Sequence, residues 1–196
     1  TPCGTLFPYT TLFRSRETAL LILNQLENTG QALDTLLEDV FDENCPLSRK
    51  DRALAYTLIY GVLRWRGRLD GIIAHFSHTR LKKIRTQVLN ILRIGLFQII
   101  FLDRIPVSAA VNTSAEMTKS HAGPWVVRFV NGILRNAARE YKTVLFPDIR
   151  EDPVAGLAAA KSFPKWMIKR WLDRFGLEAT RAICDAINTI PPITVR

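Results

Sequence analysis

Seven basic side chains lie within residues 64–85, where the only acidic residue is Asp70. They are Arg64, Arg66, Arg68, Arg80, Lys82, Lys83 and Arg85. Arginine and lysine side chains bind phosphate groups, and a cluster of them at helix ends and connections can reach the backbone of a nucleic acid. The cluster therefore predicts an RNA-binding surface, although a merely solvated basic surface would have the same composition.

A second basic group lies in the segment RFVNGILRNAAR, where Arg128, Arg135 and Arg139 are spaced seven and four residues apart and share one helix face. We expect Arg128 and Arg135 to contribute to RNA binding, but a solvated helix face explains the stripe equally well. Trp65 could stack on an unpaired base, yet a tryptophan between helices is more often part of a core. Arg93 lies in an apolar segment, and we expect it to be buried and paired, because an unpaired buried charge is very costly.

Residues that could carry catalysis or hold a metal are scattered. Cys3, Cys45 and Cys184 form no C-x-x-C pair, which argues against a zinc site or a disulfide framework and favours a reducing cytoplasm. Cys45 and Cys184 have apolar neighbours and are expected to be inert packing residues. His75 and His78 lack a third ligand nearby, so no metal site is predicted. No two glycines have the G-x-G spacing of a dinucleotide or methyl-donor loop, so we predict no cofactor site and no catalytic residue.

The net charge of +9 is distributed unevenly along the chain. Residues 16–47 carry one basic and seven acidic side chains, whereas residues 48–98 carry eleven basic and two acidic ones. This asymmetry favours a polyanionic partner such as nucleic acid. The longest apolar run, residues 88–102, is interrupted by Asn90, Arg93 and Gln98 and is too short to span a bilayer, so we expect no membrane partner.

The elements that must position these residues have helical spacing. Apolar residues recur three and four positions apart from Arg16 to about Tyr141, with breaks at glycines and prolines. Ser48 is expected to cap a helix, with Asp51 at the third position. Residues 84–102 are apolar nearly all round, which predicts a buried central helix. The predicted fold class is all-α.

Asn131-Gly132 is a frequent β-hairpin turn, but its apolar neighbours, among them Trp125 and Phe129, follow a helical period. We therefore place the pair inside a helix. Glycine at such a position costs about 1 kcal/mol relative to alanine. We expect close approach of a second helix to offset this cost, and Asn131 to be a packing residue.

The two ends of the chain differ from the rest. Residues 1–15 show no periodicity that connects them to a core, and we interpret them as a non-native extension. After Tyr141, the segment FPDIREDP has the composition of a linker. Further helices are predicted from Phe163-Pro164 to Phe175-Gly176 and from Glu178 onward. Thr194-Val195 has the pattern of a first strand, which suggests a chain cut short.

Three segments, in this order, resemble the NusB-type RNA-binding helical domain: DRALAYTLIYGVLRWRGRLD, ILRIGLFQIIFLDRIPVSAAVN and FVNGILRNAAR. More narrowly, they resemble this domain at the N-terminus of the RsmB/Sun ribosomal RNA cytosine-5 methyltransferases, because the segment from SFPKWMIK onward is similar to the connecting helices of those enzymes. The resemblance implies a NusB-like helical bundle over residues 16–145. A short helical connector over residues 146–196 would then lead to a methyltransferase module outside this chain.

The function implied by the resemblance is RNA binding on behalf of a parent enzyme that methylates carbon 5 of a cytosine in 16S ribosomal RNA. The parent would use S-adenosylmethionine, while these residues would bind ribosomal RNA, and a ribosomal protein as a further partner, without catalysing. The alternative is a NusB-like transcription antitermination factor that binds RNA together with a ribosomal protein. A third hypothesis is a protein-interaction scaffold whose basic surface is incidental.

Overall fold

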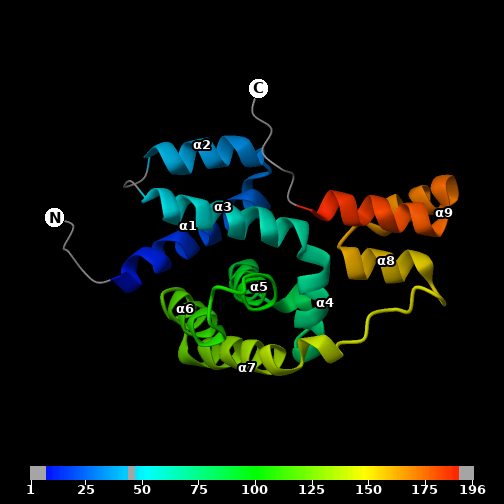
Figure 1. Ribbon diagram of the computed structural model, residues 1–196. Coiled ribbons are helices and arrows are strands. Elements are labelled where there is room, and N and C mark those ends of the chain that lie inside the picture. Colours follow the sequence, from blue (N-terminus) through cyan, green and yellow to red (C-terminus); the bar gives the residue numbers. More distant parts are fainter. Residues whose placement is uncertain (1–7, 44–46, 190–196) are drawn as a thin grey trace.

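The computed structural model describes residues 8–43 and 47–189, and every regular element in these ranges is a helix. The α-helices are α1 (Pro8–Thr29), α2 (Leu33–Glu43), α3 (Arg49–Arg64), α4 (Arg66–Phe76), α5 (Thr86–Phe101), α6 (Val107–Lys119), α7 (Pro124–Glu140), α8 (Pro153–Lys161) and α9 (Lys165–Asn188), joined by two short 3-10 helices, η1 (Leu81–Lys83) and η2 (Tyr141–Thr143). The all-α prediction is confirmed (Figure 1). The strand predicted at Thr194-Val195 lies outside the described residues.

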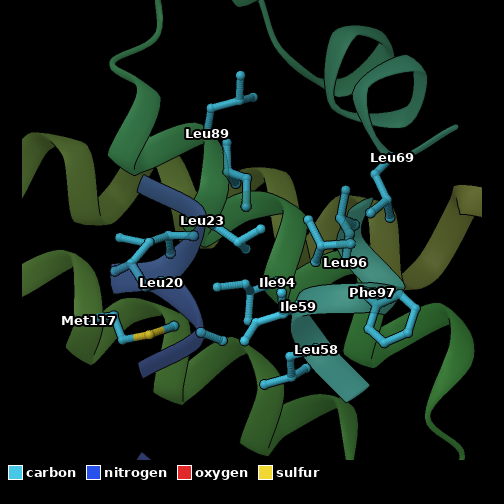
Figure 2. Packing of buried hydrophobic residues seen from close by; sticks show 14 of the residues in the cluster. Leu20, Leu23, Leu58, Ile59, Leu69, Leu89, Ile94, Leu96, Phe97 and Met117 are labelled. Atoms are coloured by element: carbon cyan, nitrogen blue, oxygen red, sulfur yellow. The ribbon is translucent and has the colours of Figure 1, made fainter. Parts of the chain in front are cut away.

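Helix α5 runs through the centre of the bundle, and α1, α3, α4, α6 and α7 all pack against it (Figure 1). Every residue from Val88 to Gln98 is buried. Figure 2 shows Leu20 and Leu23 of α1 and Ile59 of α3 gathered near Ile94 of α5. A helix that is apolar on nearly all sides needs neighbours on nearly all sides, so the central position follows from the sequence of α5.

Two glycines set how closely the neighbouring helices approach α5. A Cβ atom at Gly61 of α3 would lie 2.0 Å from Cζ of Phe97, and one at Gly95 of α5 would lie 2.7 Å from Oγ of Ser114 in α6. Real Cβ atoms do not approach other atoms this closely, so a larger residue at Gly61 would displace the Phe97 ring and one at Gly95 would displace the Ser114 side chain. The side chains packed between α3 and α5 and between α5 and α6 are therefore fitted to glycine at these two positions.

Residues Asn131 and Gly132 do lie inside α7, as predicted. Asn131 is half-buried, but Gly132 is exposed, and a Cβ atom there would have no neighbour within 4 Å. The expectation that a second helix closely approaches Gly132 is therefore wrong. At the start of α3, the predicted cap is confirmed: the Ser48 hydroxyl oxygen accepts a hydrogen bond of 3.2 Å from the backbone N–H of Asp51.

Helix α1 begins before the boundary predicted at residue 16. Phe13 packs against the main hydrophobic core, and the buried Ser15 hydroxyl donates to Oδ1 of Asp51 at 3.1 Å. The expectation that nothing connects residues 1–15 to a core is therefore wrong for the last of these residues. That the segment is a non-native extension stays a prediction.

Helices α8 and α9 enclose a second, smaller core around Leu157, Ile168 and Cys184. Burial raises the pKa of the Cys184 thiol, in agreement with its predicted role as an inert packing residue, whereas Cys45 lies outside the described residues. Within α9 the backbone takes φ +72° at Gly176, so the helix is kinked where the sequence predicted a break. The segment predicted as a mere connector thus forms a small packed unit, and α8 contacts α4.

Candidate nucleic-acid interface

The seven cations predicted to form one surface lie at the two ends of α4. Arg64, Arg66 and Arg68 lie where α3 ends and α4 begins, whereas Arg80, Lys82, Lys83 and Arg85 follow its last residue. Helix α4 has 11 residues, which at 1.5 Å per residue separates the two groups by about 16 Å. The structure therefore divides the predicted cluster into a first group before α4 and a second group after it.

The side chains of the first group contact other parts of the protein. The Arg66 guanidinium forms an ion pair with Glu27 of α1 at 3.0 Å. The Arg68 guanidinium lies 5.9 Å from the ring centroid of Trp65 and 5.8 Å from that of Phe146. The exposed Arg66 and the half-buried Arg68 are less available to phosphate than cations without such contacts.

Trp65 is partly buried and packs at the edge of the main hydrophobic core. Its ring stacks on Phe101 of α5 with the centroids 4.9 Å apart, which favours the packing interpretation over RNA stacking. Beside it, Arg64 and Tyr60 line a hollow of about 600 Å³ that reaches Asn188 of α9. Arg64 thus faces the α9 side of the molecule.

Arg93 is 2% exposed and fully paired, as predicted. Its Nε and one terminal nitrogen donate to the two carboxylate oxygens of Asp70 at 2.7 and 2.9 Å, and its other terminal nitrogen donates to Glu27 and Asn90, both at 2.8 Å. Burial by itself lowers the pKa of Arg93, but hydrogen bonding and charge from Asp70 and Glu27 outweigh burial and raise the pKa above its ordinary value. The network ties α1, α4 and α5 together and leaves no role for Arg93 as a free cation.

Two cations of the second group and residues of the α6–α7 turn line a depression of about 380 Å³, which we call the loop–turn groove. Lys83 and Arg85 come from the α4–α5 connection, while His121, Trp125 and Phe129 come from the turn and the start of α7. Trp125 is 65% exposed, and its ring stacks on Phe129 with the centroids 5.8 Å apart. The groove therefore combines cations with an exposed tryptophan that stacks on a half-buried phenylalanine, and cations beside an exposed aromatic ring are the combination that binds unpaired RNA.

The electrostatics of the groove favour an anion. None of the ion pairs among the described residues includes Lys83 or Arg85. Helices α5 and α7 both begin at the groove, and neither N-cap residue, Arg85 or Gly123, supplies a side-chain hydrogen bond to its helix. The positive ends of these two helix dipoles add to the charge of the side chains.

Further cations surround the loop–turn groove. Arg128 and Lys119 line an adjoining hollow on the other side of the α6–α7 turn, although Lys119 also pairs with Glu116 at 2.6 Å. The remaining predicted cations, Arg80, Lys82 and Arg135, are exposed. Arg135 lies two turns along α7 from Arg128, so the stripe on α7 leads away from the groove.

Toward α1, the groove adjoins a hollow of about 350 Å³ lined by Arg14, Glu17, Gln87 and His121. Burial raises the pKa of Glu17, while the charges of His121 and Arg14 oppose that shift. An acid with a raised pKa at this edge makes the local charge sensitive to pH.

Sequence reasoning missed Trp125 as a surface residue. It assigned this residue to the apolar face of a helix, but the first turn of α7 extends past the edge of the core. The available signal was the position of Trp125 directly after Gly123-Pro124, because residues in the first turn of a helix often lie outside the packed region.

The described residues contain no group of three or more His, Cys, Asp or Glu side chains placed to hold a metal ion. Within the same ranges, no helix combines the length and apolar composition that crossing a bilayer requires.

Two family models match the chain. Residues 14–139 match the NusB family, and residues 163–196 match the Methyltr_RsmF/B-like, ferredoxin-like domain. The first match covers the helices around α5 and the loop–turn groove, and the second covers α9.

Known relatives fall into two classes. The probable ribosomal RNA small subunit methyltransferase B of Bacillus subtilis (strain 168) is 37% identical over 177 residues, which cover 90% of this chain and 38% of that protein. The transcription antitermination protein NusB of Desulforudis audaxviator (strain MP104C) is 37% identical over 131 residues, which cover 65% of this chain and 92% of that protein. The chain thus spans about two-fifths of the length of the methyltransferases that it matches.

Among solved structures, the antitermination factors NusB and NusE in complex with double-stranded RNA include a chain that matches with a TM-score of 0.61 and 24% identity. The match covers 69% of this chain and all of that one. At this identity the likeness concerns the fold alone.

Proposed function

Because the chain belongs to the NusB family, we propose that it binds ribosomal RNA as the N-terminal region of a 16S ribosomal RNA cytosine-5 methyltransferase. The observation that carries RNA binding is the loop–turn groove, where Lys83 and Arg85 meet Trp125 and the N-termini of α5 and α7. Phosphates would bind the cations and the helix ends, and an unpaired base would stack on Trp125. In this proposal the chain contributes binding and orientation of the RNA for a reaction performed elsewhere.

The choice of a methyltransferase rests on the second half of the chain. Residues 163–196 are similar to a domain of RsmF/B-like methyltransferases, and the similarity to the Bacillus subtilis protein extends over 90% of the chain. S-adenosylmethionine would supply the methyl group in the parent enzyme. The described residues offer it no glycine-rich loop after a strand, so we derive no step through it.

A NusB-like antitermination factor is the second candidate. The Desulforudis audaxviator relative, 92% of which is covered, favours it. A ribosomal protein as a second partner belongs to either candidate. Reading the parent gene downstream of codon 196 separates the two: a methyl-donor loop supports the methyltransferase, and an immediate stop codon supports the factor.

Charge reversal in the groove tests RNA binding. The groove variant carries Lys83→Glu and Arg85→Glu in the groove and Arg128→Glu in the adjoining hollow. The control variant carries Arg104→Glu, Lys142→Glu and Arg150→Glu, which change the net charge equally at exposed positions. Arg104 and Lys142 follow the C-terminal ends of α5 and α7, whereas the groove lies at their N-terminal ends.

The measurement is the affinity for a single-stranded RNA of about 30 nucleotides at several salt concentrations. We expect the groove variant to bind at least about tenfold more weakly and to lose about two from the salt slope, since each phosphate contact contributes about 0.7. The control variant should stay within about twofold of the unmodified chain, apart from the general effect of net charge. Equal losses in the two variants would remove the case for the groove.

A further inference from the structure

The outward side of the first half of α9 carries a second basic surface, which the loop–turn groove does not include. We call it the α9 face; it consists of Lys165, Trp166, Lys169, Arg170 and Arg174. Four of these residues, with Asp173 as the only acid, line a hollow of about 540 Å³. Trp166 is 64% exposed.

Among the described residues, the second core does not include this surface. The opposite side of the helix packs Ile168, Trp171 and Leu172 against α8 in the second core. Trp166 takes no part in that core. A large exposed aromatic residue that a helix does not need for packing is typical of a binding surface.

The positive charges of the α9 face repel one another. Lys165 and Lys169 are four residues apart, as are Arg170 and Arg174, and like charges at this spacing destabilise a helix. No ion pair found among the described residues involves any of these four cations. An anionic partner would relieve this repulsion.

We propose that the α9 face is a second RNA-binding surface, which takes an unpaired stretch of RNA with one base stacked on Trp166 and phosphates on Lys169, Arg170 and Arg174. Aromatic side chains interleaved with cations bind single strands without reading their sequence. A membrane surface fits less well, because four cations surround Trp166 on this face and an interfacial helix needs a continuous apolar side. The choice of RNA as the polyanion rests on the function proposed above.

The two surfaces are far apart on the molecule. Figure 1 shows α9 on the side of the molecule opposite α6, and the turn that follows α6 forms one wall of the loop–turn groove. One RNA that reaches both surfaces would bind more tightly than either surface alone allows, because the second contact becomes intramolecular. The α9 face would thus select RNAs long enough to span the molecule.

The test uses the 196-residue chain with Lys169→Glu, Arg170→Glu and Arg174→Glu, beside the control variant with Arg104→Glu, Lys142→Glu and Arg150→Glu. For a single-stranded RNA of about 30 nucleotides, we expect the α9 variant to bind about tenfold more weakly, with the salt slope smaller by about two. For an RNA of about 6 nucleotides, which cannot reach both surfaces, the loss should be less than about threefold. Trp166→Ala should weaken single-strand binding about fivefold and leave the salt slope unchanged.

Thermal unfolding of each variant shows whether the fold is retained, and Trp166→Ala keeps the test meaningful if charge reversal unfolds α9. Binding of the long RNA within twofold of the unmodified chain in both variants overturns the proposal. So does a loss of binding to phosphatidylserine vesicles without a loss of RNA binding, since that assigns the face to a membrane.

The RNA affinities of the two charge-reversal variants distinguish a failure of the groove proposal from a failure of the α9 proposal. If only the variant Lys83→Glu, Arg85→Glu and Arg128→Glu loses affinity, the groove stands and the α9 face is overturned. If only the α9 variant loses affinity, the α9 face stands and the groove is refuted.

Discussion

Replacing Asp70 by asparagine removes one of the two negative charges that pair with Arg93 in the core. The substitution keeps the shape of the side chain, but the amide offers Arg93 one acceptor where the carboxylate offers two. Arg93 has a side chain only 3% exposed, so it cannot regain water. Glu27 and Asn90 still accept hydrogen bonds from its other terminal nitrogen.

The expected loss can be worked from these contacts. Breaking a buried ion pair by removing one partner costs about 3–5 kcal/mol. The side chain of Asp70 is 24% exposed and Glu27 remains, so we expect a smaller loss, about 2–3 kcal/mol in the free energy of unfolding. For a protein of this length that corresponds to a fall in Tm of roughly 5–10 °C.

Arg93→Met should cost less than Asp70→Asn. Methionine fills a similar volume, and the partly exposed carboxylates of Asp70 and Glu27 can turn to water once the guanidinium is gone. The double variant should therefore be more stable than Asp70→Asn alone, because it no longer buries a guanidinium that has lost one of its two carboxylate partners.

Urea unfolding followed by circular dichroism measures these differences. The matched control is Glu116→Gln, which breaks the exposed ion pair with Lys119 and should change the free energy of unfolding by less than about 0.5 kcal/mol. Equal stabilities of Asp70→Asn and Glu116→Gln would refute the reasoning about the buried network. A double variant less stable than Asp70→Asn would refute it as well.

Three further predictions concern single contacts. The Ser162 hydroxyl oxygen accepts from the backbone N–H of Arg68 at 2.7 Å and so caps α4 from the α8–α9 turn; Ser162→Ala should lower the free energy of unfolding by about 1 kcal/mol in urea titrations. Gly132→Ala should raise it by about 0.5–1 kcal/mol, because the position is exposed and has room for a Cβ atom; a loss would contradict the open environment. Burial raises the pKa of Glu17 from its ordinary value of 4.5, so its stabilising contribution is present below pH 4.5 and is lost as the pH rises through the folded-state pKa. Glu17→Gln should therefore gain stability relative to the unmodified chain between pH 4 and pH 7, as urea midpoints at the two pH values would show.

Several features could be predicted because they depend on local pattern. The apolar residues of α5 require neighbours all round, and the cost of an unpaired buried charge requires partners for Arg93. The helical period around Asn131-Gly132 outweighs the turn preference of that pair, because packing of a whole helix face involves more residues than one turn.

Other features depend on distances that the sequence does not contain. Arg66 and Lys83 are close in the chain, yet α4 separates their groups by about 16 Å. Lys83 and Trp125 are 42 positions apart, yet they line one groove. The environment of Gly132 likewise depends on where α6 and α4 contact α7, which no local pattern around it reveals.

Photo-crosslinking maps the RNA-contacting residues of the chain most directly. A single-stranded ribosomal RNA fragment with 4-thiouridine at its pyrimidine positions would be irradiated with the 196-residue chain, and the crosslinked peptides identified by mass spectrometry. We predict crosslinks at Trp125 or Phe129 in the peptide that begins α7, and their loss in the variant with Lys83→Glu, Arg85→Glu and Arg128→Glu. Crosslinks that avoid the α4–α5 connection and the start of α7 altogether would contradict the account.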